Sequence, residues 1–424
     1  MTVSTTTLDG IYKQLYAKDL ANLIPACALL YKEVGFSEKT AELGGSYNQP
    51  VILGAEQGFS YFAPDTSVPT LTGSVDMTVR NAKVDGFQIA GQSSMTVEAA
   101  MRATSKGPAA FEDAVGMQMR NLKESAVKRH EILFLYGQTG LAKLASRTNV
   151  STTSTTTVVT LSEWSSAIWA GFIGGKFDAY QTGTYGSQTK INTTGALVLS
   201  AVNAVTRTLT WTAAAADITA FDTYVAANAN LTEIFPFGSY NNEMPGLKRQ
   251  MTNTGTIFNI NAATFDLWRG NTYAVSTPFA LTFKELQKAV AVAAGRGLDE
   301  DVNVYVSVSA WANLNTNEAA LRQYTVTAET AVNGSKKLTF LSQNGAMNII
   351  PHLFVKEGDT FIVPVKKLMR IGATDITFDL PGTEKGRVFI QNPSILNFEY
   401  RVYSNQTLFL PCPPKAVYIS GIIN

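Results

Sequence analysis

The most regular hydrophobic pattern in the chain predicts one long helix. Between residues 108 and 137, apolar side chains recur at spacings of three or four, with one wider gap around Arg129 and His130. Pro108 suits a first helical turn, because proline lacks an N–H that such a turn leaves unpaired, and Gly137 is a typical stop. A helix of about 28 residues is about 42 Å long, so we expect a structural spine. Its apolar stripe begins with Phe111, Val115, Met119 and Leu122.

A period of two replaces the helical period between residues 51 and 89. Val75, Met77 and Val79 alternate with polar residues, as side chains do on the two faces of a strand. Residues 51–53 with 59–62 are predicted to form the opposing strand. Residues 64–73 between them are rich in Pro, Thr, Ser and Gly, which favour turns. Two interpretations stay open at this point: a hairpin inside a sheet, or a long hairpin that projects from the body.

The rest of the pattern mixes helices and strands and predicts the α+β class. Residues 8–34 have helical spacing with a break at Pro25. Further helices are predicted at 217–231, 281–294 and 311–321. Strands are predicted at 205–211, 302–308, 348–354, 360–365, 388–390, 398–403 and 417–423.

Composition narrows the class of protein. The chain has 424 residues, and its 34 Lys and Arg against 33 Asp and Glu give a formal net charge of +1. Charged residues make up 16%, below the roughly 25% of a usual soluble domain, so the surface is poor in charge. A net charge this close to zero gives little self-repulsion and favours association. Two cysteines cannot build a disulfide scaffold. We expect no export signal and no membrane span. Residues 151–216 are Thr-rich and nearly uncharged, and are predicted to be short strands and loops.

The search for catalytic chemistry returns little. His130 falls in the last turns of the long helix, where the dipole favours a cation, and His352 is expected to be structural. Cys27 is expected to be a small core residue. Residues 299–303 have the D-x-D-x-N spacing of a calcium loop but lack its glycine and its distal glutamate. We recognise no pairing of a nucleophile with a base in the sequence. We therefore expect that the protein is not an enzyme, and we expect no catalytic residue, no metal and no cofactor.

The order of these elements, together with several short phrases, resembles the major capsid protein of tailed bacteriophages. An N-terminal arm, a long hairpin, a long helix, a large mixed region and closing strands follow one another as in that family. The family-typical phrases are GSYNQPV at 45–51, VDGFQI at 84–89, EMPGLK at 243–248, NTGT at 253–256, RGLD at 296–299, and the ending 419–424. Trp268 belongs to the same set. The resemblance covers nearly the whole chain in element order.

The resemblance implies the Hong-Kong-ninety-seven-type fold and a division of the chain into parts. These are an N-terminal arm (1–45), an extended β-hairpin loop (46–97), a peripheral domain with the spine helix (98–150), a Thr-rich β segment that is a possible insertion (151–216), a mixed axial domain (217–380), and closing strands that return to the peripheral domain (381–424). The spine-helix residues are Phe111, Val115, Met119 and Leu122. Val75, Met77 and Val79 are the loop residues expected to contact a neighbouring subunit.

The resemblance also implies a structural function. Subunits of the family assemble as pentamers and hexamers into an icosahedral shell around double-stranded DNA, which they contact non-specifically. A separate scaffolding protein and a portal are expected partners, no membrane is expected, and the shell would assemble in the host cytoplasm and become the capsid of the virion. Three other classes stay open: an encapsulin-like cellular compartment of the same fold, a secreted Thr-rich β protein, and an enzyme.

Overall fold

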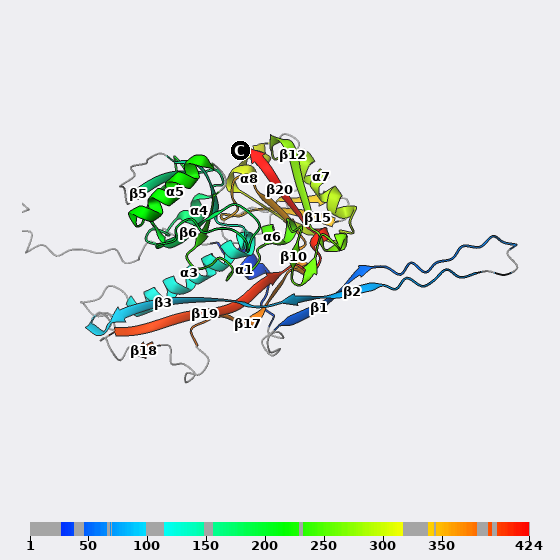
Figure 1. The fold of residues 1–424 in the computed structure, drawn as a ribbon, viewed down its shortest axis with the longest axis horizontal. Coiled ribbons are helices and arrows are strands. Elements are labelled where there is room, and N and C mark those ends of the chain that lie inside the picture. Colours follow the sequence, from blue (N-terminus) through cyan, green and yellow to red (C-terminus); the bar gives the residue numbers. More distant parts are fainter. Residues whose placement is uncertain are drawn as a thin grey trace, which may run out of the picture.

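The period-two segments become the strands of four sheets and one barrel in the computed structural model. The model describes residues 27–37, 46–65, 68, 70–98, 114–147, 156–228, 232–316, 338–342, 345–379, 389–391 and 397–423. Most of the helix predicted over 8–34, and the first turns predicted from Pro108 to Asp113, lie outside these residues. Figure 1 shows three bodies, a barrel, a mixed sheet and a long sheet under a helix, with a thin loop that points away from them.

The hairpin projects from the body, as one of the two interpretations predicted. Strands β1 (Tyr47–Gly54) and β2 (Thr78–Val84) pair antiparallel, with Ile52 opposite Val79. Beyond them the Gln57 N–H donates to the Val75 carbonyl at 3.0 Å, which extends the ribbon outward. At its base, buried Leu53, Ala82 and Val84 pack with Trp268 and Phe409. The loop is therefore anchored at one end only. Residues 59–62, predicted as a strand, are not in one.

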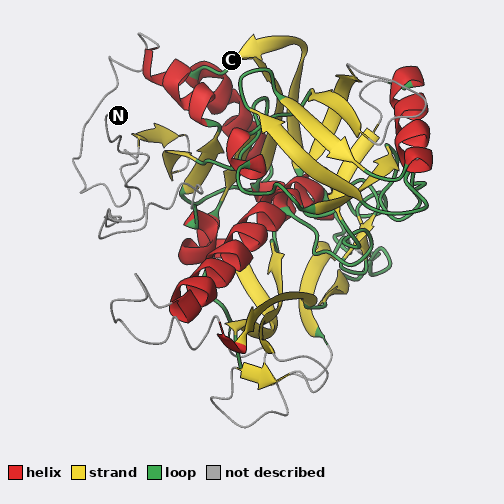
Figure 2. Cartoon of the chain, turned by 90° about the vertical axis from the view of Figure 1, so that its left-hand side faces the viewer, coloured by secondary structure: helices red, strands yellow, loops and turns green. Residues whose placement is uncertain are grey.

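The long helix, α3 (Ala114–Tyr136), lies on a sheet built from distant parts of the chain (Figure 2). That sheet pairs β3 (Phe87–Thr96) with β19 (Asn397–Phe409), and β19 also pairs β17 (Met369–Thr377) and β18 (Phe389–Gln391). A Cβ on Gly91 would come within 2.9 Å of Val402 and 3.3 Å of Leu122. Glycine at this position of β3 therefore lets the helix approach the sheet.

The second half of α3 corrects the expectation of one apolar stripe. From His130 to Tyr136 every residue is buried. His130 is not the cation that the helix dipole would favour. Burial and the nearby Arg370 lower its pKa to about 4, and its Nε2 lies 2.5 Å from Ser404 Oγ. This half of the helix joins a core that contains Trp169, Trp211 and other barrel residues. It is a central element, surrounded on all sides.

Gly137 ends α3, as predicted, because there is no room for a side chain. A Cβ there would lie 2.1 Å from the Met244 carbonyl oxygen, and one on Gly246 would lie 2.5 Å from the Gly137 nitrogen. The Gly246 N–H donates to the Gly137 carbonyl at 2.9 Å. The two backbones thus pack directly on one another, and α6 (Leu247–Met251) begins at this contact.

We expect Gly137→Ala to destabilise the subunit by about 3 kcal/mol, at the upper end of overpacking effects, because backbone atoms must move to admit the methyl group. The measurement is the urea midpoint of unfolding followed by tryptophan fluorescence. Gly35→Ala is the control, since a Cβ at that position meets no atom within 4 Å. An unchanged midpoint for Gly137→Ala would contradict the close backbone contact.

A second body is a mixed six-stranded sheet with helices. Its order is β12 (Asn271–Ala280), β20 (Val417–Ile423), β16 (Thr360–Val363), β13 (Val302–Val306), β15 (Gly345–Pro351) and β14 (Leu338–Ser342). Helices α7 (Phe283–Ala294) and α8 (Val308–Thr316) accompany it. Apolar residues of α7 and the sheet share a separate core. The helix predicted at 281–294 is confirmed from Phe283 onward, and the strand predicted at 417–423 is confirmed. The helix predicted at 311–321 is present as far as Thr316 but begins earlier, at Val308, and its residues 317–321 lie outside the described residues.

The Thr-rich segment is part of a closed six-stranded barrel. The strands in barrel order are β4 (Ala142–Arg147), β5 (Thr156–Leu161), β8 (Thr208–Thr212), β7 (Leu197–Asn203), β6 (Lys176–Gln181) and β9 (Thr232–Pro236). The short helix α4 (Ser166–Trp169) and the longer α5 (Ala215–Ala227) belong to it. Trp169, Trp211 and Phe177 meet in its interior at ring centroid distances of 5.2 to 6.1 Å.

The structural bodies do not follow the expected domain boundaries in every place. The barrel begins before residue 151 and ends after residue 216, because β4 and β9 complete its wall. Strand β17, placed in the 217–380 region, pairs with β19 beside α3. The closing region splits, since β18 and β19 join the sheet under α3 whereas β20 joins the six-stranded sheet.

Candidate functional site: the extended loop and a buried polar cluster

The extended loop presents apolar side chains to solvent. Val75, Met77 and Val79 are 54%, 51% and 42% exposed. Ile52 faces Val79 across the ribbon and is also exposed, a partner that the alternation within one strand could not indicate. Nine of the eighteen large exposed apolar side chains in the described residues lie on this loop: Ile52, Phe59, Tyr61, Phe62, Val68, Leu71, Val75, Met77 and Val79. Patches of this kind mark interaction surfaces.

A two-stranded ribbon is marginal on its own, because it has no layer to bury its side chains against. Hydrogen bonds keep the outer part closed. The Thr72 N–H donates to Ser60 Oγ at 2.8 Å, and the two hydroxyls lie 2.6 Å apart. These bonds fix the hairpin but leave its apolar area uncovered.

The predicted spine-helix residues fall into three groups. Phe111 lies outside the described residues, and Val115 is in α3 but its side chain is not described. Met119 and Leu122 are partly buried on the first half of α3. This half is held to the sheet by the Tyr400 hydroxyl, which donates to Gln118 Oε1 at 2.7 Å. Sequence reasoning placed the helix well but could not show that its two halves have different surroundings.

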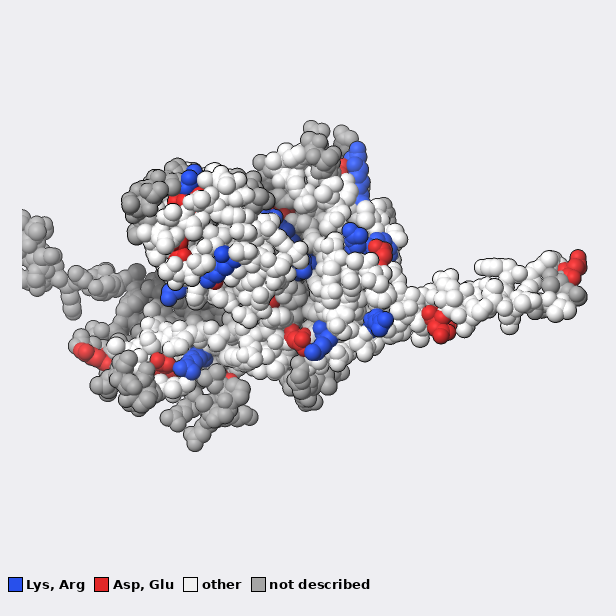
Figure 3. All heavy atoms as spheres, viewed as in Figure 1, with Lys and Arg blue, Asp and Glu red and all other residues white. Residues whose placement is uncertain are grey.

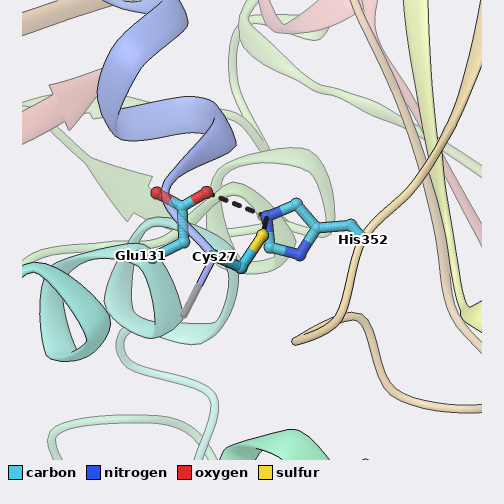
Figure 4. Close-up of side chains that lie close together, drawn as sticks. All are labelled: Cys27, Glu131 and His352. Carbon is cyan, nitrogen blue, oxygen red and sulfur yellow. Dashed lines mark hydrogen bonds and ion pairs between the residues drawn. The ribbon is translucent and has the colours of Figure 1, made fainter. Parts of the chain in front are cut away.

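A buried polar cluster joins three distant segments. Glu131 of α3 and His352 are both fully buried and form an ion pair with 2.9 Å between Glu131 Oε1 and His352 Nε2 (Figure 4). Cys27 Sγ lies 3.9 Å from the same nitrogen. Burial lowers the pKa of His352, but its bonds with Cys27 and Glu131 outweigh this and raise it to about 9. The raised pKa favours the protonated imidazole, whereas the Phe354 N–H, which donates to His352 Nδ1 at 3.2 Å, favours a lone pair on that nitrogen.

The side chains of this cluster are of types that bind metals, but their geometry is that of hydrogen bonds that hold a neighbouring segment in place. Glu131 Oε1 and Oε2 accept the N–H groups of Leu30 and Tyr31 at 2.8 and 2.9 Å. Since His352 Nε2 points at a carboxylate oxygen, it carries a proton and offers no lone pair to a metal. One imidazole nitrogen contacts both Cys27 and Glu131, so the three do not form a nucleophile–base–orienter relay. The carboxylate instead caps α1 (Leu29–Glu33).

Other buried charges hold α1 in the same place. Arg370 Nη1 donates to the carbonyls of Tyr31 and Val34 at 3.0 and 3.3 Å, and its Nη2 pairs with Asp375 at 2.5 Å. The Tyr31 hydroxyl donates to the same carboxylate at 2.7 Å. The short helix is thus fixed by charges from α3 and β17. These contacts connect the segment that precedes the loop to the body.

A second charge network holds the barrel against the six-stranded sheet. Lys356 is fully buried, and its Nζ lies 2.8 Å from Glu163 Oε2. Lys248 Nζ lies 3.6 Å from the same Glu163 oxygen and 3.3 Å from Asp359 Oδ2. The Tyr418 hydroxyl donates to the other Asp359 oxygen at 2.6 Å. Removing one member of this buried network would leave an uncompensated charge, which is strongly destabilising.

No helix among the described residues has the length and apolar character to cross a bilayer. No family model matches the sequence, and no curated protein matches it either. Solved structures do match over the whole chain. A capsid protein of cyanophage A-1(L) aligns with a TM-score of 0.55 at 12% identity, with 100% of both chains covered.

Two further matches have the same coverage. A protein of Mycobacterium phage Bobi aligns with a TM-score of 0.50 at 10% identity, and the capsid of an empty GTA particle aligns with a TM-score of 0.50 at 5% identity; each covers 100% of both chains. Identities this low show the fold. The resemblance drawn from the sequence phrases is confirmed at that level, and this α+β chain has the capsid-protein fold of bacteriophages.

Proposed function

We propose that the chain is the structural subunit of an icosahedral viral shell, assembled from pentamers and hexamers around double-stranded DNA. The observation that carries the proposal is the extended loop, an apolar ribbon with no partner surface among the described residues of its own chain, on a full-length capsid-protein fold. Val75, Met77, Val79 and Ile52 form the contact face toward a neighbouring subunit. Met119 and Leu122 belong to the spine helix of the peripheral domain, and the barrel is an insertion.

The proposal includes the partners that such a shell needs. A separate scaffolding protein directs assembly, a portal occupies one vertex, and DNA is contacted without sequence preference. The shell then forms in the host cytoplasm and becomes the capsid of the virion. The proposed role is structural and involves no catalysis. The buried cluster at Cys27 fits this role, because its hydrogen bonds hold α1 in place.

The test is assembly of the purified chain, alone and with its scaffolding protein, followed by sedimentation and negative-stain electron microscopy. We expect closed shells with fivefold and sixfold capsomers. Single chains under every condition would contradict the proposal. An encapsulin-like compartment is the alternative outcome, recognised by closed shells that hold protein cargo and no nuclease-protected DNA when isolated from their natural source.

A further inference from the structure

Strand β3 has one edge that no described strand covers. All ten of its residues pair with β19 along the other edge, without a bulge, and β19 alone among the described strands pairs with it. In an antiparallel pair, every second residue of an edge strand turns its N–H and C=O away from its partner. Within the described part of the chain, no backbone group of residues 87–92 has a hydrogen-bond partner on that side. The first half of β3 therefore offers unpaired backbone groups.

The strand also lacks the features that usually keep an edge from pairing. Its sequence, FQIAGQSSMT, contains no charged residue and no proline. Natural sheets protect their edges with such residues, with bulges or with a covering segment. On the face away from α3, Gln88, Ala90 and Gln92 are exposed and uncharged. An edge of this kind is a template for one more strand.

A groove runs along this edge. Its cavity of about 590 Å³ is lined by six consecutive residues of β3, 87–92. Successive side chains of a strand point to opposite faces of the sheet, so a cavity that touches all six lies at the edge itself. The opposite wall consists of the middle of α3 and of residues between 236 and 244, after the last barrel strand. Six residues of extended chain span about 20 Å, so the groove has the length of a short strand.

The groove has apolar walls and two unpaired cations. Leu122 and Phe172 supply apolar surface. The Arg129 guanidinium lies 5.1 Å from the centroid of the Phe172 ring, and neither it nor the exposed Lys176 at the lining has an ion pair among the described residues. Glu243 also lines the groove, but burial raises its pKa to about 8, so it is mostly uncharged at pH 7. Charged side chains are sparse on the face that Figure 3 shows, so two unpaired cations suffice to make the groove positive.

We propose that the free edge of β3 binds an extended acidic segment of a separate protein, which adds a fifth strand to the four-stranded sheet under α3. Residues that lie opposite each other on paired strands share a face of the sheet. Side chains of the added strand beside Ile89 and Gly91 therefore face α3, where a smaller cavity of about 80 Å³ is lined by Leu122 and Arg129. Apolar and acidic side chains suit these positions. The alternate side chains of the segment face solvent and are polar.

The unpaired backbone of β3 and the charge of the groove decide between the candidate occupants. A strand edge binds a single extended segment through main-chain hydrogen bonds, and the side chains of that segment add specificity. The two strands of the extended loop already pair with each other, so the loop of a second copy offers side chains rather than a free segment. The two cations of the groove select an acidic segment.

A synthetic peptide tests the site on the purified full-length subunit. The probe is the peptide SVTDTVS with both ends blocked, in which the two valines and the aspartate share one face. Its binding should slow amide hydrogen exchange in residues 87–92 and leave β17, on the other edge of β19, unchanged. Two N-methylated peptides are the controls, because methylation of alternate amides blocks one edge of the peptide at a time. One of them should bind and the other should not.

Charge variants test the acidic character of the ligand. Lys176→Gln should weaken peptide binding about two- to fivefold, the range for one exposed ion pair. Replacement of the peptide's aspartate by asparagine should have a similar effect. Arg120→Gln, an exposed change on α3 outside the groove, is the control and should have none. Equal weakening by the two variants of the chain would overturn the assigned charge complementarity.

Two results would overturn the site itself. One is unchanged exchange of residues 87–92 at millimolar peptide, or equal binding of the two methylated peptides. The other is protection of these residues that rises with subunit concentration in the absence of peptide, which would assign the edge to a second copy. Because the assay uses unassembled subunits, either result leaves the proposed function standing.

Discussion

Met77→Asp should leave the subunit folded and abolish stable shells. The side chain is 51% exposed on a loop whose anchoring core lies at its base, so the substitution removes nothing from the subunit's own core. In a shell, full burial of such a side chain against a neighbour contributes roughly 1.5–3 kcal/mol, and the carboxylate adds the cost of burying a charge. Every subunit of the shell loses the same contact free energy. The measurements are circular dichroism of the subunit and electron microscopy of assembly reactions.

Ser74→Asp is the matched control for Met77→Asp, because it adds the same charge to the other face of the same segment. We expect it to assemble. Shells of normal thermal stability from Met77→Asp would contradict intersubunit packing of this face. Loss of circular dichroism signal would show that the loop contributes to the subunit's core.

Glu131→Gln should destabilise the subunit by roughly 3 kcal/mol at pH 7, the scale for breaking a buried ion pair. The amide offers one oxygen where two N–H groups of α1 need acceptors, and it cannot stabilise the charged form of His352. The measurement is the free energy of urea unfolding. Glu56→Gln, an exposed change of the same chemistry, is the control.

The effect of Glu131→Gln should depend on pH in one direction. The pKa of His352 is about 9 in the folded chain against an ordinary 6.5, so the folded state holds its proton more tightly. This stabilisation is fully present below about pH 6.5 and is lost as the pH rises through 9. The difference between wild type and variant should therefore shrink between pH 7 and 9.5. A constant difference would mean that His352 is neutral in the folded subunit.

The local sequence pattern correctly predicted those helices and strands whose tertiary contacts agree with their local preference. The strand predicted at 417–423 has those bounds in the structure, and the helix predicted at 281–294 begins two residues later, at Phe283. The strand predicted at 205–211 is wrong at its start, because Val205 and Arg207 form the turn before β8, with φ of 56° at Arg207. The alternation of residue types in a Val-Thr-Arg-Thr run can occur in a turn as well as in a strand. Val308 was read as strand but begins α8, where Ser307 Oγ accepts the Ala310 N–H at 3.2 Å.

The sequence alone could not predict the contacts that define the candidate sites. Glu131 and His352 are separated by 221 positions, and neither has neighbours in the chain that indicate an ion pair. The two buried histidines have opposite pKa shifts, because burial and then the nearby Arg370 lower the pKa of His130, whereas the bonds of His352 with Cys27 and Glu131 outweigh its burial. The alternation of Val75, Met77 and Val79 predicted a strand, but β2 begins at Thr78, so only Val79 lies in it. The proposal that a second chain covers these side chains comes from the order of elements and the family-typical phrases, not from the local pattern.

The most direct test of the central claim is a cryo-electron microscopy map of particles assembled from this chain. The account predicts closed shells in which the loop from residue 54 to residue 78 lies on an adjacent subunit, with Ile52 and Met77 buried at that contact. A map in which the loop folds back on its own subunit, or preparations that contain only single chains in the presence of scaffolding protein, would contradict it.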